Sequence, residues 1–519
     1  MRVSVVDLFA GPGGLGEGFS AFRDDRIKFN VKLSIEKDAA AHGTLTLRSF
    51  YRQFSPETVP DDYYSYLKGE IPRGQLFRSH LRQAFRAESH SLLAELGATS
   101  PRLIDDRIIE AIQASNKWVL IGGPPCQAYS VVGRSRLTNR SRKQFESDER
   151  HYLYKEYLRI IAKFRPAVFV MENVKGLLSA KLQGQSIFDH ILSDLSYPSA
   201  AQQGFPKRRN GKNGHEREYR IYSLVKQSAD PDDLEPSDFI VESERFGIPQ
   251  RRHRVILFGV RCDLGRPSDL TLTPSLGVTV GDVLSDLPRL RSQLSNEPDS
   301  LEKWQCALRC GWGALPLHDI EEDVRYEIQR QLGLLKCASD GDLRVSALSE
   351  ATKLSKSLKG WFYDERLGAV CNHEARKHMR EDLVRYLFIS SFGRVRNRSP
   401  KLHQFPPFLL PCHQNAMRAV KSRHGNFNDR FRVQVEHDPG TTVTSHMAKD
   451  GHSFIHHDPA QCRSWTVREA ARVQTFPDNY YFEGFRTDQY RQVGNAVPPL
   501  LALQIAEKVA SVLRQESKR

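Results

Sequence analysis

The chain has 519 residues, of which 39% are hydrophobic and 27% charged, so it is long enough for two or more domains with their own cores. Its 76 Lys and Arg residues outnumber its 62 Asp and Glu residues, and the net charge of +14 favours an anionic partner, with nucleic acid as the first candidate. No apolar run approaches the ~20 residues of a membrane span, no signal peptide is recognisable, and the eight cysteines form no dense disulfide pattern. We therefore expect no membrane partner and a reducing, cytoplasmic setting.

The first elements indicate a cofactor loop. Residues 3–9 are predicted to form a buried strand, which is followed by a glycine-rich turn over 11–18 and a helix. A second strand over 29–35 ends at Glu36, where an acid can accept hydrogen bonds from ribose hydroxyls. The turn suits a nucleotide-type cofactor, but Pro12 departs from the dinucleotide fingerprint. No Gly-Lys-Ser/Thr follows, which excludes a P-loop.

A cysteine follows the next predicted strand. Residues 51–116 are predicted to form a helical insertion, and a strand over 118–121 then leads into Gly123-Pro-Pro-Cys-Gln. Two prolines fix φ and cannot donate to a sheet ladder, so they present Cys126 on a stiff turn. That position suits a nucleophile, although most free cysteines are buried and structural.

Strand and helix signals continue to alternate after Cys126. The pattern predicts a helix over 153–164, a strand over 167–171 that ends at Glu172, a late strand over 254–260 and a final amphipathic helix over 499–513. Short apolar strands alternating with helices indicate an α/β fold with a doubly wound, mostly parallel sheet. We expect residues 1–262 to form the catalytic domain and residues 463–519 to complete it.

Residues 263–462 break this alternation and are predicted to form a second, smaller domain. Within it, the segment 394–432 holds nine Lys and Arg residues against one acid, Asp429. Such a run is usually a solvated face, and here it also suits contact with phosphates. Cys306 and Cys310, and the group His452, His456, His457 and Cys462, match no common zinc spacing, so no metal is expected.

Six segments together resemble the DNA (cytosine-5) methyltransferase family. In family order they are Asp7-Leu-Phe-Ala-Gly-Pro-Gly-Gly, Gly123-Pro-Pro-Cys-Gln, Glu172-Asn-Val, Gln250-Arg-Arg-His-Arg, Arg463-Ser-Trp-Thr-Val-Arg-Glu-Ala-Ala-Arg-Val-Gln-Thr-Phe-Pro and Gln492-Val-Gly-Asn-Ala-Val-Pro. Each motif alone is modestly specific, but six in order are hard to obtain by chance. The resemblance covers roughly 1–50, 117–261 and 441–512.

The resemblance implies S-adenosylmethionine as the methyl donor and a cytosine flipped out of the duplex. Cytosine C5 is a poor nucleophile, and a thiolate that adds at C6 turns the ring into an enamine whose C5 can attack. Cys126 would be this nucleophile, and Glu172 would protonate or hydrogen-bond N3. Arg254, with Arg252, would hold the base O2 and phosphates.

By the same resemblance, a set of residues surrounds the cofactor: Phe9, Gly11, Gly13, Gly14, Glu36, Pro125, Asn495 and Val497. Glu36 would bind the ribose, and Asn495 and Val497 would return from the far C-terminus to close the pocket. Asp105 or Asp106 is a candidate for the adenine contact, and the choice stays open.

The residues expected to contact DNA lie in two places: Gln127, Ser130, Arg134 and Arg136 beside the nucleophile, and Arg394, Arg396 and Thr444 in the second domain, which resembles a target-recognition domain by position. A basic loop beside Cys126 suits closure over a phosphate backbone. The expected partners are double-stranded DNA and a cognate restriction or defence nuclease, and the chain is expected to act as a monomer.

The leading hypothesis is a DNA cytosine C5-methyltransferase of a restriction-modification or related defence system. One alternative is a tRNA cytosine C5-methyltransferase, which the long variable segment disfavours. The other is a cofactor-binding, DNA-binding regulator without turnover, which the intact set Cys126, Glu172 and Arg254 disfavours.

Overall fold

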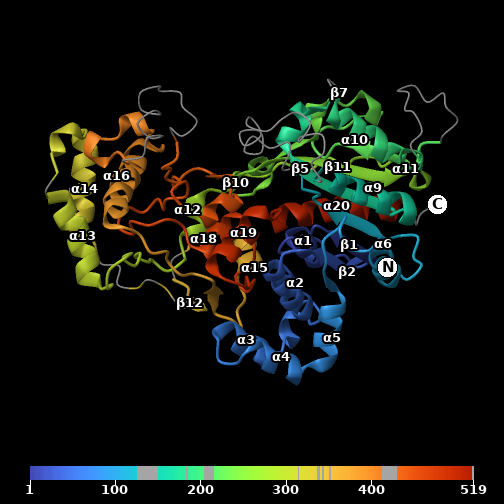
Figure 1. Ribbon diagram of the computed structural model, residues 1–519, viewed down its shortest axis with the longest axis horizontal. Coiled ribbons are helices and arrows are strands. Elements are labelled where there is room, and N and C mark those ends of the chain that lie inside the picture. Colours follow the sequence, from blue (N-terminus) through green and yellow to red (C-terminus); the bar gives the residue numbers. More distant parts are fainter. Residues whose placement is uncertain are drawn as a thin grey trace.

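A computed structural model describes residues 1–125, 150–182, 185–203, 216–228, 230–313, 315–335, 339, 341, 344–349, 352–411 and 429–516. Its centre is a mostly parallel sheet of eight strands in the order β3-β2-β1-β4-β5-β11-β8, with β9 beside β11 (Figure 1). The strands are β1 (Arg2–Leu8), β2 (Lys28–Glu36), β3 (Ser91–Leu93), β4 (Val119–Gly122), β5 (Val168–Val174), β8 (Tyr219–Tyr222), β9 (Ile240–Glu242) and β11 (His253–Arg261). The neighbouring strands in the part β3-β2-β1-β4-β5 are parallel, whereas β11 runs antiparallel to β5, β8 and β9.

Helices cover both faces of the sheet, and each face has its own apolar cluster. One face packs on α1 (Gly14–Ala21) and on α20 (Pro499–Glu516), which crosses the molecule horizontally in Figure 1. The other face packs on α6 (Pro101–Ile112), α9 (Arg150–Phe164) and α10 (Ile187–Ser196). Burial on both faces explains why the strands read as short apolar runs in the sequence.

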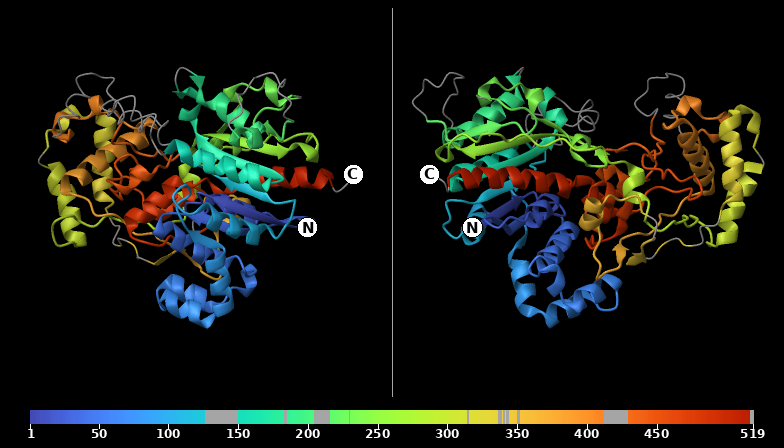
Figure 2. Two further views of the ribbon diagram at one scale, coloured as in Figure 1. Left: turned by 45° about the vertical axis from the view of Figure 1, so that its right-hand side comes forward. Right: turned by 180° about the vertical axis from the view of Figure 1, so that it is seen from behind.

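A third apolar cluster lies away from the sheet, at the opposite end of the long axis (Figures 1 and 2). It is built around α13 (Leu301–Gly313), α14 (Glu322–Gly333) and α16 (Arg380–Arg396). The cluster contains three fully buried large side chains, those of Trp304, Trp312 and Tyr386. It gives this end of the molecule a core that does not depend on the sheet.

A fourth cluster joins the two ends of the molecule. It combines α12 (Val280–Leu284) and α15 (Lys356–Phe362) with α18 (Val467–Val473) and α19 (Arg486–Asn495). This cluster therefore joins residues 465–496 to residues of the segment 263–462. Residues 497–513, in contrast, pack on the sheet.

The remaining described elements are short or peripheral. The helices are α2 (Ala39–Tyr51), α3 (Asp61–Lys68), α4 (Arg73–Ser79), α5 (Leu81–Ser89) and α11 (Pro198–Gln202). The two-stranded pairs are β6 (Lys181–Leu182) with β7 (Gln185–Ser186), β10 (Gln250–Arg251) with β14 (Gly440–Thr441), and β12 (Val345–Ala347) with β13 (Ala369–Cys371).

Two sequence expectations need correction. The segment 51–116 is not entirely helical, because β3 pairs in parallel with β2 and forms one edge of the central sheet. At three residues, β3 is too short to show a strand pattern in the sequence. Glu172 lies inside β5 and not at its end, since the antiparallel partner β11 extends the strand to Val174.

One described helical stretch, over residues 486–514, is long and apolar enough to cross a membrane by composition. Its apolarity has another explanation here, because α20 packs against the sheet and α1, and 67% of the apolar stretch is buried inside the protein.

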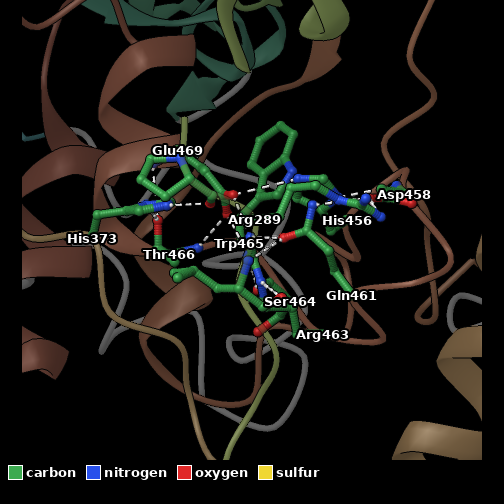
Figure 3. Close-up of polar contacts among 12 residues, drawn as sticks. Arg289, His373, His456, Asp458, Gln461, Arg463, Ser464, Trp465, Thr466 and Glu469 are labelled. Atoms are coloured by element: carbon green, nitrogen blue, oxygen red, sulfur yellow. Dashed lines mark hydrogen bonds and ion pairs between the residues drawn. The ribbon is translucent and has the colours of Figure 1, made fainter. Parts of the chain in front are cut away.

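Buried polar groups hold α18 in place. Glu469 accepts hydrogen bonds from Arg463 (Nη2–Oε1, 2.6 Å; Nη1–Oε2, 2.7 Å) and from the backbone N–H of Thr466 (2.7 Å), and His456 Nε2 lies 3.4 Å from its Oε1 (Figure 3). Asp458 forms an ion pair with Arg289 (2.8 Å) at the edge of this group. A buried charge is tolerated only when it is paired and hydrogen-bonded in this way, so each of these partners is needed.

Asp458 predicts an acid-sensitive contribution to stability. Burial would raise the pKa of its carboxyl, but His456, Arg289 and a hydrogen bond from Gln461 outweigh this effect and hold the pKa at about 2. The unfolded value is about 3.9, so the ionised carboxylate stabilises the folded state above about pH 4, and this contribution is lost as the pH falls toward 2. Asp458→Asn should lower the free energy of unfolding by about 2 kcal/mol at pH 6 and by about half as much at pH 3, measured by urea denaturation.

The matched control is Asp25→Asn, which changes an exposed carboxylate between α1 and β2 and should leave the difference between pH 6 and pH 3 as in the wild type. Equal loss of stability at both pH values for Asp458→Asn would contradict the assignment.

Candidate active site

Glu172 and Arg254 meet where β5 and β11 pair. The antiparallel register sets Arg254 opposite Val174, and the Arg254 Nε atom lies 3.0 Å from Glu172 Oε1. Both side chains are mostly buried, with 17% and 14% of their surface exposed, so the ion pair is weakly screened by water. The structure thus brings two of the residues predicted for catalysis together.

The turn after β4 lies against the same carboxyl group. A Cβ atom built on Gly123 would lie 3.1 Å from Glu172 Oε2, and Asn173 donates a hydrogen bond to the Pro124 carbonyl (3.4 Å). Glycine at 123 therefore allows the turn to approach Glu172 closely. Pro125 is the last described residue of this turn, and Cys126 lies outside the described residues.

Arg252 links three of the sequence motifs. Its Nη1 donates hydrogen bonds to the carbonyl of Val443 (3.1 Å) and to that of Gly494 (3.3 Å), and its Nη2 lies 4.0 Å from Glu172 Oε1. Burial and the charge of Arg254 lower the pKa of Arg252 to about 9, and Glu172 opposes this shift. The side chain is 4% exposed. Its guanidinium group thus binds mainly backbone carbonyls, which suits a role in positioning chain segments.

Gln250 extends this buried network. Its side chain accepts a hydrogen bond from the Val443 N–H (2.7 Å) and donates one to the Gln474 side chain (2.6 Å). Gln474 in turn donates to the carbonyls of Val493 (2.7 Å) and Ala496 (3.0 Å). These bonds join residues 250, 443, 474 and 493–496, and Arg252 links this group to the Glu172 carboxyl.

The glycine turn after β1 adopts the backbone that its sequence predicts. Gly11 and Gly13 have φ values of 55° and 93°, which side-chain-bearing residues rarely adopt, and Phe9 also has a positive φ of 55°. A Cβ atom on Gly14 would lie 2.1 Å from the Val497 carbonyl oxygen, so the C-terminal segment lies directly on this turn. Asn495, two residues earlier, is exposed at the end of α19.

Glu36 is oriented by backbone N–H groups at the end of β2. Its carboxylate accepts hydrogen bonds from Gly11 (2.8 Å), Lys37 (2.9 Å) and Asp38 (2.9 Å). A cavity of about 430 Å³ opens beside it at the carboxyl ends of β2 and β3 and is lined by Lys37, Asp38, Leu93, Ala94, Glu95 and Thr99. In open α/β sheets, ligands bind outside the carboxyl ends of the strands.

Glu95 was not predicted from the sequence, although it lines this cavity and pairs with Lys37 (2.8 Å). An acid two residues after a strand would have indicated this position. Because β3 was not predicted from the sequence, Glu95 could not be identified. Of the two residues considered for the adenine contact, Asp105 is 7% exposed and forms ion pairs with Arg159 (2.8 Å) and Lys163 (2.6 Å), and neither residue lines the cavity.

Asp7 is a buried carboxyl beneath the glycine turn. It is 1% exposed, and among the described residues its carboxyl has only a weak backbone hydrogen bond, from Gly16. Burial raises its pKa to about 8, with Arg52 opposing and Glu36 adding to the shift.

The predicted DNA contacts are only partly described. Gln127, Ser130, Arg134 and Arg136 lie outside the described residues. Arg394 lies 3.5 Å from Glu327 and 3.6 Å from Asp458, and Arg396 pairs with Asp323 and Glu321. DNA would have to compete with these carboxylates. Thr444 is exposed, and its backbone packs on Gly494 beside the Arg252 network.

In the described part of the chain, no group of three or more His, Cys, Asp or Glu side chains could hold a metal ion. Cys306 and Cys310 lie with their sulfur atoms 3.0 Å apart on α13.

Comparison with known proteins identifies the class. The sequence model of the C-5 cytosine-specific DNA methylase family matches residues 100–197 and 365–511. The type II methyltransferase M.Bpa9945I of Bacillus paralicheniformis is 32% identical over 98% of this chain and 99% of its own length. The DNA (cytosine-5-)-methyltransferase M.ApeKI of Aeropyrum pernix is 27% identical over 99% of each chain. A prophage-encoded E. coli protein assigned as a DNA modification methyltransferase shares the fold, with a TM-score of 0.51, 18% identity and 99% of each chain covered.

The chain therefore belongs to the C-5 cytosine-specific DNA methylase family. It is a DNA cytosine C5-methyltransferase, and membership implies S-adenosylmethionine as the methyl donor. These findings confirm the predicted DNA cytosine C5-methyltransferase and do not favour a tRNA methyltransferase or a regulator without turnover.

The contact between Gly14 and Val497 gives a prediction. Gly14→Ala should lower the free energy of unfolding by about 1–3 kcal/mol, because its methyl group would overlap the Val497 carbonyl. It should also weaken S-adenosylmethionine binding, because the glycine turn must shift. Denaturation and titration calorimetry measure the two effects. Gly360→Ala in α15 is the control, since a Cβ there meets nothing within 4 Å, and equal behaviour of both variants would contradict the packing.

Proposed function

We propose that Cys126, Glu172 and Arg254 carry the methylation reaction and that Arg252 positions the segments around them. The observation that supports this most directly is the Glu172–Arg254 ion pair of 3.0 Å beside the Gly123–Pro125 turn, because Cys126 follows Pro125 by one peptide bond. A nucleophile, an acid and a cation would then act at one cytosine ring.

The chemistry assigns a task to each group. The Cys126 sulfur, as thiolate, forms a bond to C6 of the extruded cytosine, and the C5–C6 π electrons move onto C5 and the ring. Glu172 donates a proton or hydrogen bond to N3, which makes the ring a better electrophile. Arg254 binds the developing negative charge at O2 and orients the Glu172 carboxyl. When bound, S-adenosylmethionine supplies the electrophilic methyl group. Loss of the C5 proton then expels the Cys126 sulfur and restores the ring.

We propose that the pocket between the glycine turn and the cavity beside Glu36 takes the cofactor. The carboxylate of Glu36, oriented by three N–H groups, suits a pair of ribose hydroxyls. The 430 Å³ cavity with Leu93 and Glu95 suits the adenine, and the turn from Phe9 to Gly14, Pro125 and Val497 suits the methionine part. Asn495 would close the pocket near the base.

We propose that the end of the molecule built on α13, α14 and α16, within residues 263–462, recognises the DNA target, with residues 1–262 and 463–519 as the catalytic part. A separate apolar core supports this division, although the cluster around α18 crosses it. Thr444 would contact the backbone beside the flipped base, and Arg394 and Arg396 would bind phosphates after leaving their carboxylate partners.

The type II methyltransferase names of the relatives support a role in a bacterial restriction-modification system, with action on double-stranded DNA in the cytoplasm. A cognate nuclease would be the partner enzyme, and the methyltransferase would act as a monomer. Methylation-sensitive sequencing of a host that expresses the chain would show which sequence is modified.

A covalent-trapping experiment tests the assigned roles. Duplex DNA containing 5-fluorocytosine at the target should form a stable adduct in the presence of S-adenosylmethionine, because fluorine cannot leave C5 as a proton does. Cys126→Ser should abolish the adduct, and Glu172→Gln should slow its formation by about 10²–10⁴-fold through loss of the N3 proton donor. Denaturing gel electrophoresis measures both.

Glu70→Gln, at an exposed position on the α3 side of the molecule, is the matched control and should trap DNA at the wild-type rate. An adduct with Cys126→Ser would show that another group is the nucleophile. Trapping of tRNA in preference to DNA would contradict the proposed substrate.

A further inference from the structure

Helices α13 and α14 lie at the end of the molecule far from the sheet (Figures 1 and 2). A cavity of about 230 Å³ lies between them. Arg309 and Trp312 line it from the last turns of α13, and Leu317 lines it from the connection. Arg325, Ile328 and Leu332 line it from one face of α14, since they recur at helical spacing. No proposed role in methylation uses this cavity.

The floor of the cavity is apolar. Trp312 and Ile328 are each 2% exposed, and Leu317 and Leu332 are partly buried beside them. An aromatic or aliphatic side chain that covered this floor would be stabilised by burial of apolar surface.

The rim carries two cations that form no ion pair with any described residue, those of Arg309 and Arg325. The neighbouring acids are already engaged: Glu327 pairs with Arg330 (2.7 Å), and Asp323 pairs with Arg396 (2.5 Å). Two uncompensated guanidinium groups above an apolar floor select an anionic group with an apolar centre.

The size of the cavity identifies the occupant further. Small-molecule sites usually measure about 300–1,000 Å³, whereas a cavity of this volume suits a single bulky side chain, the usual anchor of a protein interface. A phosphate backbone would use the arginines and leave the floor empty. We propose that this cavity is a docking site for an acidic segment of a partner protein. One tyrosine side chain enters between α13 and α14 with its ring on the apolar floor, and flanking carboxylates bind Arg309 and Arg325.

The test uses the full chain and a fluorescein-labelled Glu-Asp-Tyr-Glu-Asp peptide, with binding followed by fluorescence anisotropy. We expect saturable binding. It should weaken at least about 10-fold when glycine replaces the tyrosine, and equally when Arg309→Glu and Arg325→Glu are combined. Arg82→Glu with Arg102→Glu, which makes the same charge change on exposed residues of α5 and α6, should bind as the wild type.

DNA methylation and the urea midpoint of each variant establish that it is folded. Undetectable binding of the peptide, equal binding of the glycine peptide, or equal weakening by the Arg82 and Arg102 pair would overturn the proposal. Displacement of the peptide by duplex DNA, together with a parallel loss of methylation in the Arg309 and Arg325 pair, would assign the cavity to nucleic acid and would also overturn it.

Discussion

The antiparallel pairing of β11 with β5 is the constraint on which the site depends. In an otherwise parallel stretch of sheet, this reversal places the start of β11 beside the end of β5, so Arg254 reaches Glu172. A parallel β11 would carry Arg254 to the opposite edge of the sheet. The same register brings Arg252 within 4.0 Å of that carboxyl, where it also holds the carbonyls of Val443 and Gly494.

Buried polar contacts convert this pairing into a rigid pocket. Gln250 and Arg252 bind backbone groups more than 190 residues away, Gln474 binds the carbonyls of Val493 and Ala496, and Arg463 and Glu469 fix α18. In a low-dielectric interior such contacts are strong when satisfied and costly when broken. The site is therefore positioned by hydrogen bonds that join distant motifs, and the apolar clusters supply the stability on either side.

Much of this could be predicted from the sequence. The strands before and after the glycine turn could be predicted because buried strands give short apolar runs. Glu36 and Arg254 could be predicted because they are polar residues at the ends of such runs. Glu95 was missed because its strand has only three residues, and the exact position of Glu172 was missed because β11 extends β5. The partners of Arg394 and Arg396 could not be foreseen, since ion pairs between distant segments leave no local pattern.

A double-mutant cycle on Glu172 and Arg254 tests the central claim most directly. The rate of covalent adduct formation with 5-fluorocytosine DNA would be measured for Glu172→Gln, Arg254→Ala and the double variant. If the two groups act as one unit, the effects are strongly non-additive, with a coupling energy of about 1–3 kcal/mol. Effects that add to within about 0.5 kcal/mol would show that the two residues act independently and would contradict the account.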